Sequence, residues 1–328
     1  MTDVPVLGWG LLGTARINRM LIPPLRVSPR NRVVAVASRD RARAVAYAAE
    51  WGIGRAHGSY EDLLADPDVH VVYVALPNHL HVEWTVRAAR AGKHVLCEKP
   101  LALAPSDVDR VAAAARECRV AVAEAFMYRH HPQTLRIKEL VDGGAVGAIR
   151  LVRGSFSFPL TRPNDVRLDP AMGGGSLWDV GCYPVSFTRF VLGTEPTEVF
   201  GQWTLGPTGI DETFAGQMLF PGGVVAQLDC GFRSPLRAEV ELVGSDGTIL
   251  VRQPWKPVPG VSFLLTREGK ADEVVVDGEE LYGLEIEDLA DAALLGRPPR
   301  VSLVESRGNA ATLVALLESA RSGRAVRM

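Results

Sequence analysis

Glu98, Lys99 and Pro100 form the run whose residue types and position best suit proton chemistry. The run follows an apolar segment at 93–97, which predicts a buried strand. Ligands of an open α/β sheet bind outside the carboxyl ends of its strands. An ammonium group at that edge can polarise a substrate oxygen or lower the pKa of a neighbouring group. In isolation the run would indicate only a solvated charge pair, but lysine is rare in this chain and the surrounding sequence supports a functional role.

The N-terminal part of the chain alternates between strand-like and helix-like patterns. Apolar segments predict strands at 6–12, 33–37, 69–76, 93–97 and 120–123. Helical spacing between them predicts helices at 41–51, 81–91 and 107–118, the last with Ser106 as its N-cap. Strands that alternate with helices of this length indicate crossover units in a parallel sheet.

The turn after the first predicted strand has the features of a dinucleotide-phosphate site. The literal Gly-x-Gly-x-x-Gly pattern at 8–13 would place bulky side chains where the backbone must approach a pyrophosphate. We therefore end the strand at residue 12 and predict a turn over 13–18, whose amides face the phosphates at a helix N-terminus. Ala15 and Asn18 occupy the second and third glycine positions, which departs from the usual fingerprint. The predicted cofactor contacts in this turn are Gly13, Thr14, Ala15, Arg16 and Ile17.

The end of the second predicted strand favours NADP over NAD. An NAD site usually carries an acidic residue here to hold the ribose hydroxyls. Ser38 occupies that position and Arg39 follows it, a donor fork suited to a 2′-phosphate. NAD stays open as the alternative cofactor, and Ser38 stays open to a second role as cap of the following helix.

Polar residues also follow the strand predicted at 69–76. Pro77 and Asn78 stop that strand at the sheet edge that carries Lys99. We expect residues at this edge to contact the nicotinamide or ribose of the cofactor. For His79 and His81 the alternative is an ordinary role at the start of a helix. The residues predicted to bind the cofactor at this edge are Leu76, Pro77, Asn78, His81, Glu98 and Lys99.

Five segments resemble, in order, the glucose–fructose oxidoreductase / inositol dehydrogenase / MocA-type family; they lie at 13–17, 75–81, 97–101, 124–132 and 173–184. The resemblance implies a Rossmann domain, predicted at 1–123, followed by an α+β domain with a large, mainly antiparallel open sheet at 124–328. Whether the C-terminal helix packs back toward the N-terminal domain is left open. The resemblance also implies NAD(P), hydride transfer to or from sugars, cyclitols and related alcohols or ketones, and assembly as homodimers or homotetramers.

The second half of the chain independently predicts an antiparallel sheet. Alternating apolar patterns predict strands at 149–158, 198–205, 213–220, 224–232, 238–243 and 248–251, and helical patterns lie at 132–142, 284–295 and 303–322. Pro221-Gly222-Gly223 and Ser245-Asp246-Gly247 predict tight turns between neighbouring strands. The segment 159–175 has no regular periodicity, and long irregular loops of this kind are often functional.

The resemblance places the acid–base chemistry on a helix after the glycine-rich segment. In the family this helix commonly carries Asp-x-x-x-His; here Tyr183 stands four residues after Asp179, which puts both on one helix face. Tyrosine at this position resembles the dihydrodiol, xylose and glucose–fructose branches and the sugar 3-ketoreductases. A phenol titrates at about pH 10 in water, and a nearby Lys99 would stabilise the phenolate. We predict that Tyr183 donates or accepts the proton while Lys99 orients the substrate oxygen, with the exchanged roles left open.

Other residues near this helix are assigned to substrate binding. Asp179, which we count with Lys99 and Tyr183 among the predicted catalytic residues, is expected to bond to a substrate hydroxyl or to Lys99. Its alternative role is in a capping box, with Ser176 as the N-cap and Asp179 at the third helical position. For Trp178 the alternative to substrate binding is packing between the domains. For Arg129 the alternative is a structural ion pair. The predicted substrate contacts are Arg129, Arg167, Trp178 and Asp179.

Composition argues against several other classes of protein. A net charge of -2 shows no basic bias toward nucleic acid. No apolar run reaches the roughly 18 residues of a membrane span. Met1–Val4 does not begin a signal peptide, so we predict a cytoplasmic location. The four cysteines show neither metal-ligand spacing nor a disulfide framework, and no metal is predicted.

Together these observations predict an enzyme, an NAD(P)-dependent oxidoreductase acting on the CH–OH group of a sugar-type substrate. It would be an aldose 1-dehydrogenase or a keto-sugar reductase, with the direction left open. Within the enzymes, the alternative is a trans-dihydrodiol dehydrogenase. From another class, the alternative is a non-catalytic NAD(P)-binding regulator, against which the presence of both Lys99 and Tyr183 argues.

Overall fold

The computed structural model describes residues 6–278 and 280–328, which form two compact units. Met1–Val4, on which the prediction about a signal peptide rested, lie outside the described residues. The first unit contains the chain up to Met127 together with Tyr282–Ser306, and the second contains Tyr128–Leu281 and Arg307–Met328. The predicted division at 123/124 therefore differs from the observed one mainly in residues 282–306, which group with the first unit.

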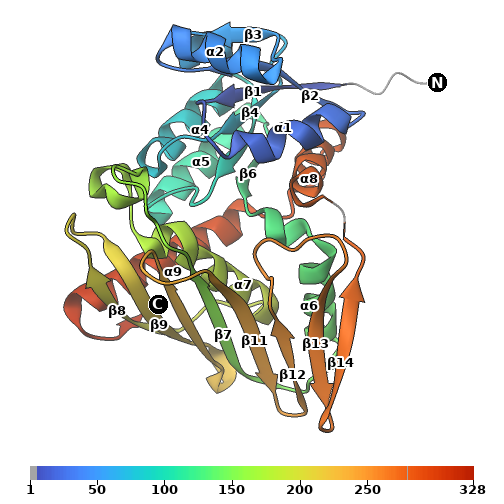
Figure 1. The fold of residues 1–328 in the computed structure, drawn as a ribbon, viewed down its shortest axis with the longest axis vertical. Helices are drawn as coiled ribbons and strands as arrows, with labels where there is room; N and C mark the ends of the chain where they lie inside the picture. Colours follow the sequence, from blue (N-terminus) through green and yellow to red (C-terminus); the bar gives the residue numbers. More distant parts are fainter. Residues whose placement is uncertain (1–5, 279) are drawn as a thin grey trace. The chain divides into compact units, whose positions relative to one another are not determined.

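The first unit is built on a six-stranded parallel sheet with the strand order β3-β2-β1-β4-β5-β6 (Figure 1). Its strands are β1 (Leu7–Leu12), β2 (Asn31–Ala37), β3 (Arg55–His57), β4 (Val71–Val74), β5 (His94–Glu98) and β6 (Val122–Ala125). The helices are α1 (Asn18–Val27), α2 (Arg41–Trp51), α3 (Tyr60–Ala65), α4 (His81–Arg90) and α5 (Pro105–Cys118). This order confirms the predicted Rossmann fold, whose ligands bind where the strand order reverses, between β1 and β4.

Two predicted helix caps differ from the structure. Helix α5 begins at Pro105, with Ala104 as its N-cap, so Ser106 lies inside the first turn. Proline fits the first helical position because its fixed φ suits the helix and its missing N–H has no partner there. Helix α2 is capped by Asp40, whose side chain accepts from the Arg43 amide, and not by Ser38.

Helix α8 (Leu281–Leu295) belongs to the first unit through a polar network at its side. Arg30 donates from Nε to Glu287 at 2.9 Å and from Nη1 to Asp291 at 2.7 Å. Ser28 donates its hydroxyl to Glu287 at 2.6 Å. These contacts join residues more than 250 positions apart, so local patterns predicted a helix at 284–295 but did not assign it to the first unit.

The second unit is built on a nine-stranded sheet with the order β14-β13-β12-β11-β7-β10-β9-β8-β15. The strands are β7 (Ile149–Ser157), β8 (Glu198–Leu205), β9 (Asp211–Leu219), β10 (Val225–Gly231), β11 (Arg237–Gly244), β12 (Gly247–Val251), β13 (Val261–Arg267), β14 (Lys270–Val276) and β15 (Val326–Arg327). All neighbouring pairs are antiparallel except β7 and β10, which are parallel. The mainly antiparallel sheet is confirmed, whereas β13, β14 and β15 were not predicted.

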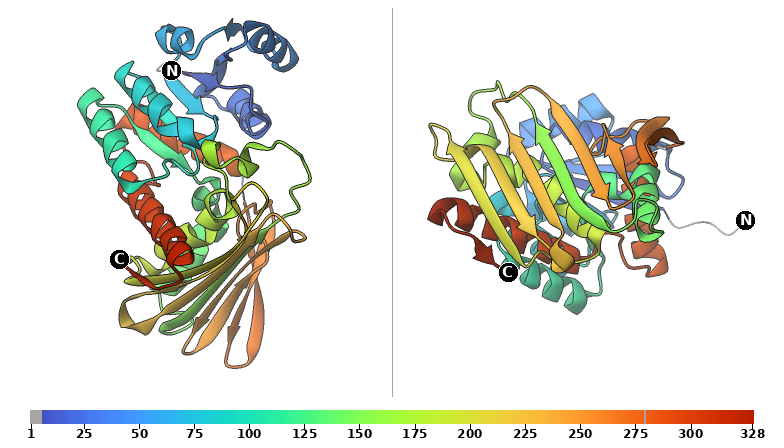
Figure 2. Two further views of the ribbon diagram at one scale, coloured as in Figure 1. Left: turned by 90° about the vertical axis from the view of Figure 1, so that its left-hand side faces the viewer. Right: turned by 90° about the horizontal axis from the view of Figure 1, so that it is seen from below.

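Helices α6 (Pro132–Asp142), α7 (Cys182–Leu192) and α9 (Leu303–Ser322) accompany this sheet, and Figure 2 shows its strands side by side. Two glycines let helices approach it. A Cβ at Gly154 in β7 would lie 2.7 Å from Pro184 of α7, and one at Gly201 in β8 would lie 2.8 Å from the Leu316 carbonyl oxygen of α9. Residues of β9 alternate between buried and exposed, so one face of the sheet carries the core. Among the described helices, none is both long and apolar enough for a membrane span.

Candidate active site

The turn after β1 presents unpaired backbone donors at the point where the strand order reverses. Gly13 has φ +94°, and a Cβ there would lie 3.2 Å from the Ala75 carbonyl oxygen, so glycine is required. The Asn18 side chain donates to the Gly13 carbonyl at 2.9 Å and closes the turn. Among the described residues, no hydrogen bond is formed by the amides of 14–17. Free amides before a helix suit the phosphates of a dinucleotide, so this turn fits NAD(P).

Two arginines after β2, Arg39 in the loop and Arg43 in the first turn of α2, act on one tyrosine. Tyr60 is buried, and burial raises the pKa of its hydroxyl, while the charges of Arg39 and Arg43 lower it. Both guanidinium groups therefore lie close enough to Tyr60 to act on its hydroxyl. The Ser38 hydroxyl accepts from the Asp40 amide. Arg43 was missed in the sequence, although its spacing of four residues from Arg39 places both on one side of a helix start.

His81 joins the loops that follow β4 and β5. Its ring is 1% exposed, and its nitrogens lie 2.7 Å from the Pro100 carbonyl oxygen and 2.8 Å from the Leu76 carbonyl oxygen. Burial lowers the pKa of His81 to about 4 and outweighs the two carbonyl contacts, which raise it. Through these two contacts His81 holds the two loops together. Its predicted contact with the cofactor stays a prediction.

The Lys99 loop is anchored on both sides. Tyr73 donates its hydroxyl to Glu98 Oε1 at 2.5 Å, and the Lys99 amide donates to Glu98 Oε2 at 3.3 Å. Burial, followed by the charge of Glu98, holds the pKa of Tyr73 well above its usual value. The Lys99–Pro100 peptide bond is cis. Lys99 itself is partly exposed at the carboxyl edge of the sheet. Leu76, Pro77 and Asn78 follow β4 at the same edge.

In the second unit, a π-helical turn, η5 (Leu177–Gly181), precedes α7 and carries Trp178 and Asp179. The predicted capping box is wrong, because Ser176 makes no side-chain cap and donates its hydroxyl to Asp211 Oδ2 at 2.7 Å. Asp179 instead accepts from Arg167 Nε at 2.7 Å. π-Helical turns often occur at functional sites.

Arg167 lies between two carboxylates. Besides Asp179, its Nη1 contacts Asp165 at 3.1 Å, and the charge of Asp179 raises the pKa of the guanidinium above its usual value. The glycine-rich loop packs against the same segment, since a Cβ at Gly174 would lie 2.4 Å from the Arg167 carbonyl oxygen. Arg167 therefore positions Asp179, and its predicted contact with substrate stays a prediction.

Tyr183 lies in a cluster of aromatic rings. Its ring centroid is 5.2 Å from that of Phe156 and 5.7 Å from those of Tyr128 and Trp255, and the residue is 4% exposed. Tyr128 donates its own hydroxyl to Ser186 Oγ at 2.9 Å. This packing fixes the plane of the Tyr183 ring.

The remaining predicted substrate residues are also buried. Arg129 is 3% exposed, and its guanidinium carbon lies 3.7 Å from the centroid of the Phe190 ring. Trp178 is 7% exposed. Arg129, Trp178, Asp179 and Tyr183 all belong to the second unit, whereas Lys99 and the cofactor turn belong to the first. Their roles toward substrate stay predictions.

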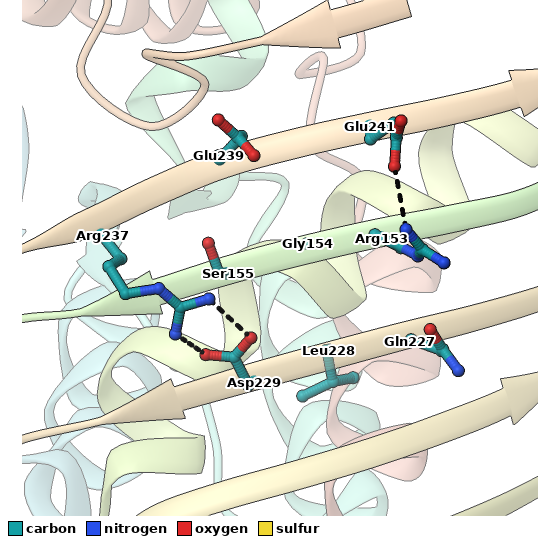
Figure 3. A pocket seen from close by; sticks show the side chains of 9 residues that line it. All are labelled: Arg153, Gly154, Ser155, Gln227, Leu228, Asp229, Arg237, Glu239 and Glu241. Atoms are coloured by element: carbon teal, nitrogen blue, oxygen red, sulfur yellow. Dashed lines mark hydrogen bonds and ion pairs between the residues drawn. The ribbon is translucent and has the colours of Figure 1, made fainter. Parts of the chain in front are cut away.

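A polar hollow on the sheet of the second unit is distinct from these residues (Figure 3). Strands β7, β10 and β11 line it, and ion pairs occupy its walls. Arg237 contacts Asp229 at 2.5 Å, and Arg153 contacts Glu241 at 3.4 Å. Both arginines of the lining are paired with carboxylates, so the hollow offers an anionic ligand no unbalanced positive charge.

Each of the two units contains a segment that matches a known protein family. Residues 7–126 match the oxidoreductase family with an NAD-binding Rossmann fold, and residues 134–250 match the Gfo/Idh/MocA C-terminal domain. This chain belongs to the Gfo/Idh/MocA oxidoreductase family. As a member, it is an NAD(P)-dependent oxidoreductase acting on CH–OH groups.

Three known proteins illustrate the similarity. A D-xylose 1-dehydrogenase (NADP(+)) from Haloferax volcanii is 38% identical over 324 residues, covering 98% of this chain and 99% of the relative. A crystal structure of a 3-ketoreductase from Actinomadura kijaniata with NADP and TDP-benzene has a TM-score of 0.90 and 32% identity, covering 96% of this chain and 98% of that one. The aldose-aldose oxidoreductase of Caulobacter crescentus, complexed with glycerol, has a TM-score of 0.90 and 27% identity, covering 98% and 100%.

Proposed function

We propose that this chain is an NADP-dependent oxidoreductase of a sugar or sugar derivative, either an aldose 1-dehydrogenase or a keto-sugar reductase. The observation that carries the proposal is Tyr183, a phenol held by aromatic packing on the same helical segment as Asp179. The xylose dehydrogenase and the 3-ketoreductase support a sugar-type substrate, because both resemble this chain over nearly its whole length.

The preference for NADP rests on charge at the end of β2. Arg39 and Arg43 lie together beside Tyr60, and the position after the strand holds Ser38 where an acidic residue would serve NAD. Two guanidinium groups can form ion pairs with the doubly charged 2′-phosphate of NADP. The ribose hydroxyls of NAD are uncharged and offer no such ion pair. The Haloferax volcanii relative is named for NADP(+), and the Actinomadura kijaniata enzyme binds NADP.

The cofactor, when bound, accepts or supplies the hydride at nicotinamide C4. The residues of the chain then manage the proton of the substrate hydroxyl. Tyr183 Oη accepts this proton during oxidation and returns it during reduction, and the Lys99 ammonium orients the substrate oxygen and stabilises the phenolate. This mechanism requires the Lys99 ammonium and the Tyr183 hydroxyl to contact the same substrate oxygen.

Asp179 is assigned to a neighbouring substrate hydroxyl. Its carboxylate is already held by Arg167, so it can accept a hydrogen bond from a sugar with little loss of side-chain freedom. Trp178 follows Leu177 in the same turn and offers an aromatic face suited to the C–H surface of a pyranose. Arg129 and Arg167 remain the proposed cationic contacts with the substrate.

A substrate panel with a matched pair of variants tests this proposal. Aldoses with NADP⁺ and keto-sugars with NADPH are assayed by the absorbance of NADPH, with a trans-dihydrodiol included. Tyr183→Phe should lower turnover by roughly 10²- to 10⁴-fold and leave NADPH binding, measured by fluorescence, unchanged. Tyr128→Phe removes a phenol hydroxyl from the same aromatic cluster and serves as the control, which should keep most of its turnover.

Near-normal turnover of Tyr183→Phe would refute the assigned proton step. Turnover of the dihydrodiol without turnover of any sugar would replace the proposed substrate class. Tight NADPH binding without turnover of any member of the panel would also contradict the sugar proposal.

A further inference from the structure

Asp211 connects the start of β9 to the helical segment that carries Asp179 and Tyr183. Its Oδ2 accepts two hydrogen bonds of 2.7 Å, one from the Ser176 hydroxyl and one from the Leu177 amide. Leu177 is the first residue of η5, and η5 continues directly into α7. The residue is 4% exposed. A single buried oxygen thus holds both donors at the point where this segment begins.

The loop before η5 is shaped to the same carboxylate. Gly175 has φ +127°, a conformation that favours glycine, and a Cβ there would lie 2.3 Å from Asp211 Oδ1. The Gly175 carbonyl in turn accepts from the Asp179 amide at 3.1 Å. Both oxygens of Asp211 therefore lie against the backbone that sets the position of Asp179.

The Asp211 carboxylate accepts hydrogen bonds from a backbone amide and a hydroxyl, which offset only part of the cost of its burial. Within the described part of the chain, Asp211 forms no ion pair. The next residue, Glu212, is paired with Arg233, and Asp179 across the turn is paired with Arg167. From β10, Cys230 lies 3.6 Å from the Ser176 hydroxyl. The first backbone amides of a helix have no hydrogen-bond acceptor within the helix. A carboxylate at this end accepts from one of them, and its negative charge interacts favourably with the helix dipole.

We propose that Asp211 is a positioning residue for the reaction: its carboxylate fixes the start of η5 and thereby the placement of Asp179 and Tyr183 against the substrate. This inference rests on the proposed function, because it acts through Tyr183. Asp211 is assigned no contact with substrate or cofactor. Its effect is geometric, and a displacement of about 1 Å in a catalytic group can cost about 10²-fold in rate.

The test compares Asp211→Asn with Glu212→Gln. Both variants neutralise a buried carboxylate at the start of β9, but only Asp211 contacts η5. Asp211→Asn should lower kcat by about tenfold or more, with the dissociation constant of NADPH unchanged because the cofactor turn belongs to the first unit. Glu212→Gln should keep kcat near that of the parent. Equal kcat values for the two variants would overturn the inference.

A smaller perturbation covers the case in which Asp211→Asn does not fold. Ser176→Ala removes one of the two donors and leaves the Leu177 amide bond in place. It should lower kcat by about two- to fivefold at unchanged NADPH affinity. An unchanged kcat in Ser176→Ala would overturn the inference.

A double variant separates this inference from the proposed function. In the Tyr183→Phe background, Asp211→Asn should have less effect on turnover than in the parent, because the phenol hydroxyl that it positions is gone and only the placement of Asp179 is left to lose. The same fold-loss in both backgrounds would overturn the positioning role. Parent-like turnover of Tyr183→Phe alone would instead overturn the proton step of the proposed function.

Discussion

Replacement of Asp211 by asparagine should change how the stability of the protein depends on pH. Burial raises the pKa of Asp211 from 3.8 to about 6, and the hydrogen bonds from Ser176 and Leu177 only partly oppose this rise. A carboxyl group with a raised folded-state pKa stabilises the folded state in its protonated form. Its contribution is therefore fully present below pH 3.8 and is lost as the pH rises through about 6.

The size of this effect follows from the shift. A change of about 2 pKa units corresponds to about 3 kcal/mol between the fully protonated and fully ionised limits. Over the accessible window from about pH 5 to about pH 7, linkage leaves a change of about 1.3 kcal/mol. Asparagine does not titrate, so Asp211→Asn lacks this term, and its stability relative to the parent should rise by that amount across the window.

Urea unfolding of both proteins at several pH values measures this difference. The hydrogen bonds that asparagine loses or keeps add a constant, so the slope against pH is the diagnostic quantity. Glu212→Gln is the control for the removal of a neighbouring buried carboxylate at the start of β9. A difference between Asp211→Asn and the parent that stays flat from about pH 5 to about pH 7 would refute the assignment of a raised pKa to this buried carboxyl.

Four further predictions concern the two units. Arg39→Ala and Arg43→Ala should each raise KM for NADP⁺ by about tenfold with little change for NAD⁺, measured by steady-state kinetics; an equal loss with both cofactors would contradict the 2′-phosphate assignment. His81→Leu should lower kcat by about tenfold, because the carbonyls that flank the Lys99 loop lose their shared partner; parent-like kcat in the same assay would contradict this role. Gly174→Ala should lower the free energy of unfolding by more than about 2 kcal/mol, because its Cβ would meet the Arg167 carbonyl oxygen at 2.4 Å; urea unfolding tests this. Arg30→Met should lower the free energy of unfolding by about 1 to 2 kcal/mol in the same measurement, because it removes the contacts of Arg30 with Glu287 and Asp291 of α8; no loss would contradict the role of this network.

Local periodicity was sufficient to predict much of the architecture. Helices α2, α6 and α9 and strand β8 have the bounds predicted from spacing alone. The parallel sheet followed from strands that alternate with helices, and Gly13 marked the turn because few other residues adopt its φ of +94°. These features depend on neighbours within a few residues, which a sequence displays directly.

Strands with weak patterns escaped the same reasoning. Strand β14 begins Lys-Ala-Asp-Glu and is mostly exposed, so its residues lack the apolar alternation that marks a half-buried strand. The parallel pairing of β7 with β10 was equally hidden, because β10 lies next to β9 in sequence and also borders β7 in the sheet. Register between distant strands depends on which surfaces meet in the folded chain.

The sequence by itself determined the family, the Rossmann sheet and the residue types available for chemistry. Only the tertiary structure decided how those residues are used: Ser176 bonds to Asp211 across 35 positions and does not cap its helix, His81 joins two loops, and Arg167 holds Asp179. The physical reason is the same in each case. A buried polar group must find a partner, and the partner that folding brings within reach is rarely the nearest one in the chain.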